Sequence, residues 1–308
     1  MAALRTTVGR RLKSAGNSIL GWLAVAILKA IRLIGPDATS NIGGWVMRRI
    51  GPMLSEHRIG RANLKAAFPE KSDAEIERIL RDVWDNLGRV GAEFAHIDRL
   101  WDYDETASQH GRIMDLAEEV ARARKSRTTG KPMLCFSAHL ANWEMSAVAA
   151  RQLGIETTVL YRPPNLAAVA AVVVEMRKSC MGPLVASGLS APRQLADVLE
   201  AGGNVAMLVD QYAVGGVPVT FFGRPTQANP LIARLARLYD CNIHGMRTIR
   251  QPGNRFSLNF TEAIPPVRDA EGKVDVQGTM QAITDVVEGW VREHPEQWLW
   301  LHRRWRGT

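Results

Sequence analysis

The hydrophobic residues of this 308-residue chain recur at two different spacings along its length. After Ser72, which forms a capping-box pattern with Glu75, eight apolar residues recur at helical spacing. They are Ile76, Ile79, Leu80, Val83, Leu87, Val90, Phe94 and Ile97. This spacing predicts a long helix whose apolar stripe packs against a core.

From Met133 onward, short apolar runs without polar alternation are separated by helix-favouring stretches, which is typical of parallel strands covered on both faces. The predicted strands are Met133–Phe136, Thr157–Tyr161 and Val205–Val209, then Ile243–Thr248 and Phe256–Phe260 with Gly253–Asn254 as a hairpin turn. The predicted helices are Met114–Lys125, Trp143–Leu153, Leu166–Lys178, Arg193–Ala201 and Val276–Glu293. This order predicts an α/β fold with a central, mostly parallel sheet flanked by helices.

The amino-terminal segment Ser18–Ile34 is apolar and follows a cluster of basic residues. It lacks a convincing cleavage site, so we expect it to stay on the protein. Its uninterrupted apolar run, Ile19–Leu28, is shorter than the roughly 20 residues that cross a bilayer. The segment therefore predicts an interfacial membrane helix, or a spanning helix if Lys29 and Arg32 extend their charges to the headgroups.

The net charge of +8 is concentrated at the amino-terminal end. Residues 1–65 carry eleven lysines and arginines against two acids, and the remainder is nearly neutral. Such an excess beside an apolar segment favours an anionic membrane surface over nucleic acid. Three cysteines without metal or disulfide spacing agree with a reducing compartment. We expect a membrane-associated helical region at 1–105 and an α/β catalytic domain at 106–308.

The strongest candidate for chemistry is the pair His139 and Glu144. His139 follows a predicted strand, and Glu144 begins a predicted helix about one turn further on. A carboxylate there could hold one ring nitrogen while the other faces a substrate, as in a general base with its orienting partner. A histidine and a glutamate five positions apart often occur by chance, but ligands of open α/β folds bind at this edge of the sheet.

Three further candidates follow predicted strands or end a predicted helix. Arg162 and Asp210 come after the second and third strands, so we expect them on the same rim as His139. Arg162 is either a surface arginine or a group that grips an anion or a developing oxyanion. Asp210 is either a structural ion-pair residue or a second acid of the site. Arg177 is a candidate contact for a phosphate or a carrier protein.

Aromatic residues in the second half of the chain leave two interpretations open. Phe221 and Phe222 would be costly to expose unless they line an apolar tunnel or touch lipid, and a buried loop is the alternative. The ending with Trp298, Trp300 and Trp305 suits either a membrane interface or packing of the last segment onto the sheet.

Taken together, these motifs resemble those of the bacterial lipid A late acyltransferases, the lauroyl and myristoyl transferases within the lysophospholipid acyltransferase superfamily. The matching motifs are Arg61-Ala-Asn-Leu with Phe68-Pro69, His139-Leu-Ala-Asn-Trp-Glu144, Tyr161-Arg-Pro163, Asp210-Gln211, Phe221-Phe-Gly223, and Pro295-Glu-Gln297 through His302-Arg-Arg304. The histidine and acid motif is shared across the superfamily, whereas the carboxyl-terminal motifs are more specific to the lipid A branch, whose relatives include mycobacterial mannoside acyltransferases.

The resemblance implies an acyltransferase-like αβα fold and a membrane-bound enzyme of the bacterial inner membrane whose catalytic domain faces the cytoplasm. It would move a fatty acyl chain from acyl carrier protein to a hydroxyl of a lipid A precursor, with no metal, cofactor or nucleic acid. His139 would be the base and Glu144 its partner. Arg162, Arg177, Asp210 and Phe222 would contact substrates.

Several alternatives remain at this point. A serine hydrolase would use Ser137, but this residue is only two positions from His139 and lacks the G-x-S-x-G context. The acyl donor could be acyl-coenzyme A, and the acceptor another glycolipid or a lysophospholipid. A lipid-binding protein without catalysis would keep the anchor and the aromatic ending but would not need His139 and Glu144.

Overall fold

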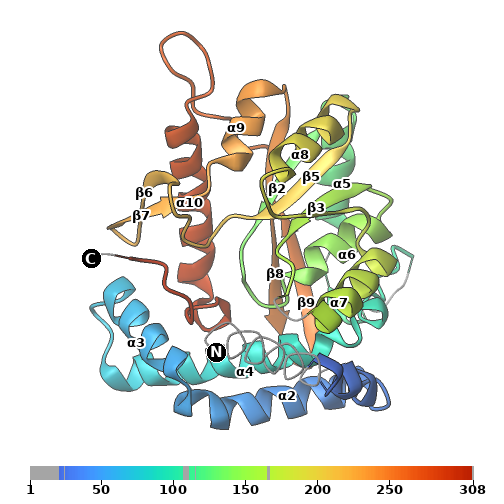
Figure 1. Cartoon of the computed structure of the whole chain (residues 1–308), viewed down its shortest axis with the longest axis vertical. Coiled ribbons are helices and arrows are strands. Elements are labelled where there is room, and N and C mark those ends of the chain that lie inside the picture. Colours follow the sequence, from blue (N-terminus) through green and yellow to red (C-terminus); the bar gives the residue numbers. More distant parts are fainter. Residues whose placement is uncertain (1–20, 24, 107–110, 115, 165–166, 307–308) are drawn as a thin grey trace, which may run out of the picture.

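The fold is built around a seven-stranded sheet with the order β1-β9-β8-β2-β5-β3-β4 (Figure 1). This computed structural model describes residues 21–23, 25–106, 111–114, 116–164 and 167–306. The strands are β1 (Ile113–Met114), β2 (Met133–Ser137), β3 (Thr157–Tyr161), β4 (Leu184–Ala186), β5 (Asn204–Leu208), β8 (Asn242–Gln251) and β9 (Arg255–Phe260). Among these described strands, every neighbouring pair is parallel except the hairpin of β8 and β9. The mostly parallel sheet predicted from the apolar runs is confirmed.

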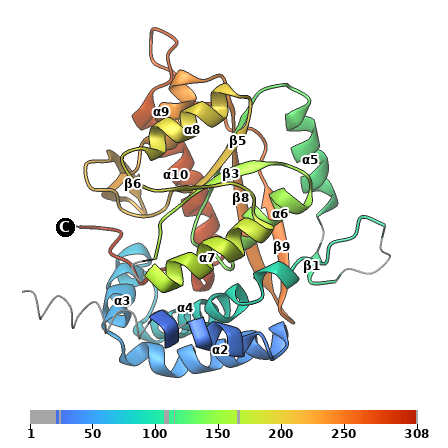
Figure 2. The ribbon, with the colours of Figure 1, turned by 45° about the vertical axis from the view of Figure 1, so that its right-hand side comes forward.

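Helices cover both faces of the sheet, which explains why β2 is buried at every position. On one face, Leu134 and Phe136 share a core with α8 (Ala191–Glu200), α9 (Leu231–Leu238) and α10 (Val276–Glu293). On the other face, Met133 and Cys135 pack with residues of α5 (Ala117–Arg127) and α6 (Glu144–Gln152). The helix α7 (Ala167–Cys180) lies on the same face as α6 (Figure 2).

Three amino-terminal helices lie across the end of the sheet to which β8 points (Figures 1 and 2). They are α2 (Pro36–Ile50), α3 (Ser55–Ala67) and α4 (Asp73–Phe94), with the short 3₁₀ helix η1 (Gly51–Met53) between the first two. The capping box of Ser72 and Glu75 is present, and the predicted stripe of α4 is largely buried. The helices α2 and α4 cross closely at Gly43 and Gly88, two residues without a Cβ atom. A Cβ atom on either glycine would collide with the backbone carbonyl of the other.

The predicted membrane segment is only partly described. Residues 25–31 are helical, whereas residues 18–20 and 24 lie outside the described residues. Within the part of the chain that the structure describes, no helix combines the length and the apolar character needed to cross a membrane.

Two predicted elements need correction. The helix predicted to begin at Met114 begins instead at Ala117, because residues 113–114 pair with β9 as the short edge strand β1. The segment predicted as a loop around Phe221 is a hairpin of β6 (Val217–Phe221) and β7 (Arg224–Ala228). Its turn places Phe222 and Gly223 in the left-handed region, with φ of 54° and 68°. A phenylalanine is an uncommon residue at such a φ, so the sequence does not announce this turn.

Candidate active site

The carboxyl ends of β2 and β5 bring His139 and Asp210 together. β2 ends at Ser137, and β5, its parallel neighbour, ends at Leu208. Nδ1 of His139 lies 2.8 Å from Oδ1 of Asp210. The expected convergence at one rim of the sheet is therefore present for these two residues.

Asp210 is a fully buried carboxylate that accepts three hydrogen bonds. Besides Nδ1 of His139, the backbone N–H of His139 and Nε1 of Trp298 each donate to Oδ2 at 2.8 Å. Burial opposes ionisation, but the charge and hydrogen bonds of His139 outweigh it and hold the pKa of Asp210 well below its usual range. Asp210 is therefore a charged acceptor fixed on one side of the imidazole.

The second ring nitrogen of His139, Nε2, is not held by Asp210. Because an ionised carboxylate can only accept, Nδ1 carries the proton and neutral His139 presents the lone pair of Nε2. The side-chain amide nitrogen of Gln211 lies 3.5 Å from Nε2. Burial lowers the pKa of His139, yet the attraction and hydrogen bond of Asp210, helped by the charge of Glu144, raise it above its ordinary value. This is the arrangement of a general base.

Glu144 does not hold the imidazole nitrogen that the sequence analysis assigned to it. Its carboxylate is hydrogen bonded by Nε of Arg177 at 3.0 Å, by a second nitrogen of the same guanidinium, and by Nε1 of Trp143 at 3.2 Å. The physical reason is strand order: β5 lies beside β2 and places Asp210 against His139, whereas Glu144 begins α6 and faces α7. Glu144 acts on His139 through its charge.

The two arginine candidates lie at the same cavity but in different environments. Arg177 pairs with Glu144, and its guanidinium carbon lies 5.5 Å from the ring centre of Phe94 and 5.7 Å from that of Tyr161. Arg162 follows β3, is exposed, and lines the cavity. Both arginines line the cavity, but of the two only Arg162 is exposed.

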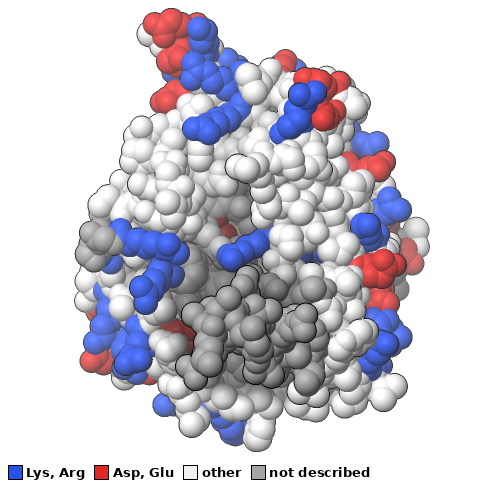
Figure 3. Space-filling model, viewed as in Figure 1, with Lys and Arg blue, Asp and Glu red and all other residues white. Residues whose placement is uncertain are grey.

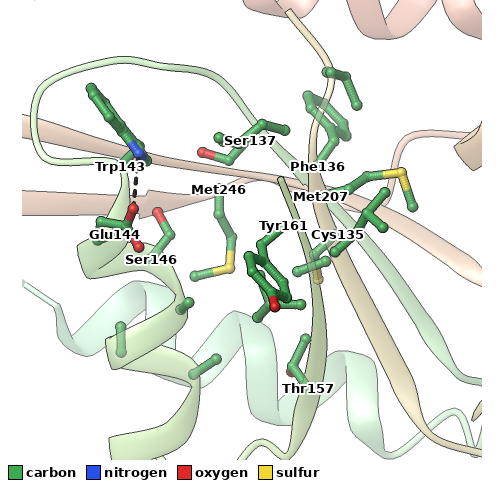
Figure 4. A pocket seen from close by; sticks show the side chains of 18 of the residues that line it. Cys135, Phe136, Ser137, Trp143, Glu144, Ser146, Thr157, Tyr161, Met207 and Met246 are labelled. Atoms are coloured by element: carbon green, nitrogen blue, oxygen red, sulfur yellow. Dashed lines mark hydrogen bonds between the residues drawn. The ribbon is translucent and has the colours of Figure 1, made fainter. Parts of the chain in front are cut away.

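The cavity has a volume of about 600 Å³ and extends from this polar group into the interior. His139, Glu144, Arg162 and Arg177 line its polar part. Further inside, the wall is largely apolar and consists of residues from β2, β3, β5, β8, β9, α5 and α6, several of which are drawn in Figure 4. From Ser137 back to Met133, the wall formed by β2 is about 13 Å long at the usual strand rise. The cavity can therefore hold an elongated apolar group with a reactive polar end.

Ser137 lines the cavity but is not set up as a nucleophile. Its hydroxyl oxygen is buried and has no hydrogen-bond partner among the described residues. The proton-bearing nitrogen of His139 is directed to Asp210 instead. A serine hydrolase needs a base within hydrogen-bond reach of the hydroxyl, so this geometry disfavours that alternative.

The carboxyl-terminal segment contributes groups that the sequence analysis missed. Trp298 donates to Asp210, and the backbone around it pairs with the His139 loop: Ala141 N donates to Gln297 O at 2.9 Å, and Leu299 N to His139 O at 3.0 Å. Trp298, Trp300 and Trp305 are all buried. Of the two interpretations, this supports packing of the last segment onto the protein and not contact with a membrane interface. The Pro-Glu-Gln motif before Trp298 pointed to the family resemblance, but it did not indicate that Trp298 donates to Asp210.

Phe222 lies in the core rather than in the cavity. Its ring contacts Phe68, Phe221 and Trp300 at centroid distances between 4.9 and 5.7 Å, and the guanidinium carbon of Arg292 lies 4.3 Å from its ring centre. The cavity lining does not include Phe222. The expected substrate contact is replaced by the alternative, a buried turn, because these aromatic rings enclose the side chain.

Comparison with protein families yields a match. A family model described as bacterial lipid A biosynthesis acyltransferase matches residues 10–307, nearly the whole chain. The search of the curated proteins returned no match.

The two carboxylates should have distinguishable effects on the pKa of His139. In wild-type protein we expect this pKa above the ordinary value of about 6.5. Asp210→Asn removes the charge that favours the imidazolium and leaves the effect of burial, so the pKa should fall below that value. Glu144→Gln should lower it by less. An NMR titration of the histidine rings measures both shifts, with His244, whose pKa is lowered by burial and does not depend on either carboxylate, as an internal reference. Equal shifts in the two variants would contradict the assignment of Asp210.

Proposed function

The chain belongs to the bacterial lipid A biosynthesis acyltransferase family, and from this premise we propose that it moves a fatty acyl chain, of the lauroyl or myristoyl type, from acyl carrier protein to a hydroxyl of a lipid A precursor. The observation that carries the proposal is Nε2 of His139, the ring nitrogen not held by Asp210, at the polar part of a largely apolar cavity. An acyl chain in the cavity would place its thioester carbon beside this nitrogen.

The proposed reaction is a single acyl transfer. His139 Nε2 accepts the proton of the acceptor hydroxyl while the oxygen forms a bond to the thioester carbon. The tetrahedral intermediate collapses, the C–S bond breaks, and the imidazolium returns its proton to the departing thiolate. Asp210 keeps the ring in the required tautomer and stabilises the imidazolium. The reaction produces an ester and a free thiol.

The charged groups around His139 have separate proposed roles. Glu144, held by Arg177, adds a second negative charge that favours the imidazolium. Arg162 is exposed at the cavity and supplies a cation for the developing oxyanion or for a phosphate of the acceptor. Figure 3 shows lysine and arginine side chains beside a central hollow on one face of the molecule, which suits anionic partners such as the acceptor and the carrier protein.

The proposed location is the bacterial inner membrane, with the catalytic domain facing the cytoplasm, where acyl carrier protein is found. Ten of the fourteen large apolar side chains that are exposed among the described residues lie between 22 and 54. They are Trp22, Leu23, Ile27, Leu33, Ile34, Ile42, Trp45, Ile50, Met53 and Leu54. Basic residues are interspersed with them, and the guanidinium carbon of Arg49 lies 3.9 Å from the ring centre of Trp45. Apolar side chains mixed with cations support attachment to an anionic membrane surface.

Substitutions at the site test the reaction. His139→Ala should abolish transfer of a labelled acyl chain from acyl carrier protein to a lipid A precursor in membranes, while the protein stays folded. Asp210→Asn should reduce kcat by about 1,000-fold, because the amide favours the wrong tautomer. Glu144→Gln leaves the Nδ1 bond intact and should cost only about tenfold, the equivalent of one pKa unit. A fully active His139→Ala protein would refute the mechanism, and wild-type protein that binds the donor without transfer would identify a lipid-binding protein. Transfer from acyl-coenzyme A alone would correct the donor.

The cavity can be tested by shortening it. Ala123 of α5 is buried and lines the cavity near Met133, whereas Ala121 of the same helix is exposed. Ala123→Leu should shift the preferred acyl chain to a shorter one, because the added carbons occupy the apolar part of the cavity. Mass spectrometry of the product formed from a mixture of acyl donors measures the shift. Ala121→Leu is the matched control, and an unchanged product distribution in both variants would show that the acyl chain binds elsewhere.

The membrane proposal predicts a combined effect of apolar contact and charge. A variant with Trp22, Ile27, Trp45 and Met53 changed to Ser should remain partly bound to vesicles containing anionic lipid at low salt and be released at high salt. Wild-type protein should stay bound at both. Leu189→Ser is the control, since Leu189 is also exposed but lies outside residues 22–54. If sedimentation shows the multiple variant bound at high salt as tightly as wild type, the exposed side chains are not the anchor.

A further inference from the structure

Glu93 of α4 is a buried carboxylate whose hydrogen bonds join four parts of the chain. Arg250 of β8 donates to it twice, from Nη1 at 2.5 Å and from Nη2 at 2.9 Å. Ser40 of α2 donates its hydroxyl to Oε1 at 2.6 Å, and Asn142 of the His139 loop donates its amide to Oε2 at 2.9 Å. The side chain of Glu93 is only 2% exposed, so these donors replace the water that a carboxylate would otherwise bind.

The partner of Glu93 is tied to the carboxyl-terminal segment. The backbone N–H of Arg250 donates to Oε1 of Gln297 at 2.8 Å, and Nε2 of Gln297 donates to the carbonyl of Arg250 at 3.2 Å. Nε of Arg250 also donates to Asn86, whose amide donates to the carbonyl of Gln297 at 3.1 Å. That same carbonyl accepts the N–H of Ala141 in the His139 loop. The His139 loop is therefore hydrogen bonded directly to Glu93 and, through Gln297, to its partner Arg250.

The loop needs this support because its backbone is strained. Ala141 has a φ of 47°, in the left-handed region that disfavours residues with a Cβ atom. Such conformations persist where surrounding contacts determine them, and they concentrate at functional sites. The hydrogen bonds of Ala141 and Asn142 lie two and three residues from His139, so they fix the direction in which the loop presents its ring.

We propose that Glu93 is a positioning residue, which acts through Asn142 to hold residues 139–142 so that Nε2 of His139 faces the cavity. The inference rests on the proposed acyl transfer. A purely stabilising role would not require this chemistry, since well-packed apolar residues often replace buried ion pairs without loss of stability. An apolar residue in place of Glu93 could not accept the amide hydrogen of Asn142.

The structure offers a matched pair of substitutions to test the proposal. Asn142→Ala and Ser40→Ala each remove one buried hydrogen bond to the same carboxylate, but only the first disconnects the His139 loop. The amide nitrogen of Asn142 donates this bond and the amide oxygen has no hydrogen-bond partner among the described residues, so the substitution removes little besides this bond. Glu93→Ala would leave Arg250 buried without its carboxylate and risks unfolding the protein, so it is not the informative variant.

Two measurements on the full-length variants decide the outcome. Asn142→Ala should lower kcat by about 100-fold with little change in KM for the acyl donor, while Ser40→Ala stays within about twofold of wild type and both lose similar thermal stability. At a fixed pH, the ¹⁵N chemical shifts of the His139 ring should change in Asn142→Ala and match wild type in Ser40→Ala.

Equal kcat values and equal ring shifts in the two variants would overturn the positioning role. Wild-type protein that transfers no acyl chain would overturn the proposed function instead, and the ring shifts would still decide whether Glu93 positions His139.

Discussion

The structure depends on keeping one buried carboxylate charged. Asp210 has no exposed side-chain surface, so its charge survives only because His139 and Trp298 donate hydrogen bonds to it. These donors come from the end of β2 and from the carboxyl-terminal segment, and the acid itself follows β5. The pairing of β2 with β5 and the docking of the last residues are thus conditions for a correctly oriented imidazole. Loss of either would remove hydrogen bonds that keep this buried charge stable.

Glu144 is a second carboxylate near Asp210, and the two negative charges would repel each other unless each were paired with its own cation. Each carboxylate has a separate partner: Asp210 is bound to His139, and Glu144 is bound to Arg177. The cation of each pair comes from a different element, so the two acids approach the same imidazole without sharing a partner. Beyond them the cavity wall is largely apolar, which strengthens electrostatic interactions at its polar part.

The sequence predicted those features that follow from local pattern. Continuous apolar runs specified parallel strands, and the ends of those strands specified a rim with His139, Arg162 and Asp210. It could not specify which acid holds His139, because that depends on β5 lying beside β2, and periodicity does not encode strand order. The prediction that Phe222 contacts substrate was wrong for a related reason. Its partners Phe68 and Trp300 lie far away in the sequence, so only tertiary packing decides whether its ring lines a tunnel or lies in the core.

The helix α2, which carries several of the exposed apolar side chains, is connected to the His139 loop through the carboxylate of Glu93. α2 presents Ile42 and Trp45 outward, and its buried Ser40 donates to Glu93, which also binds Asn142. Because Gly43 and Gly88 allow α2 and α4 to touch backbone to backbone, little space remains for one helix to shift against the other. This rigidity has a direct consequence for the proposed reaction. In the proposed attachment, the membrane-facing surface and the imidazole would keep a fixed relative orientation, so that docking on the lipid surface would also set the direction from which the acceptor hydroxyl reaches His139.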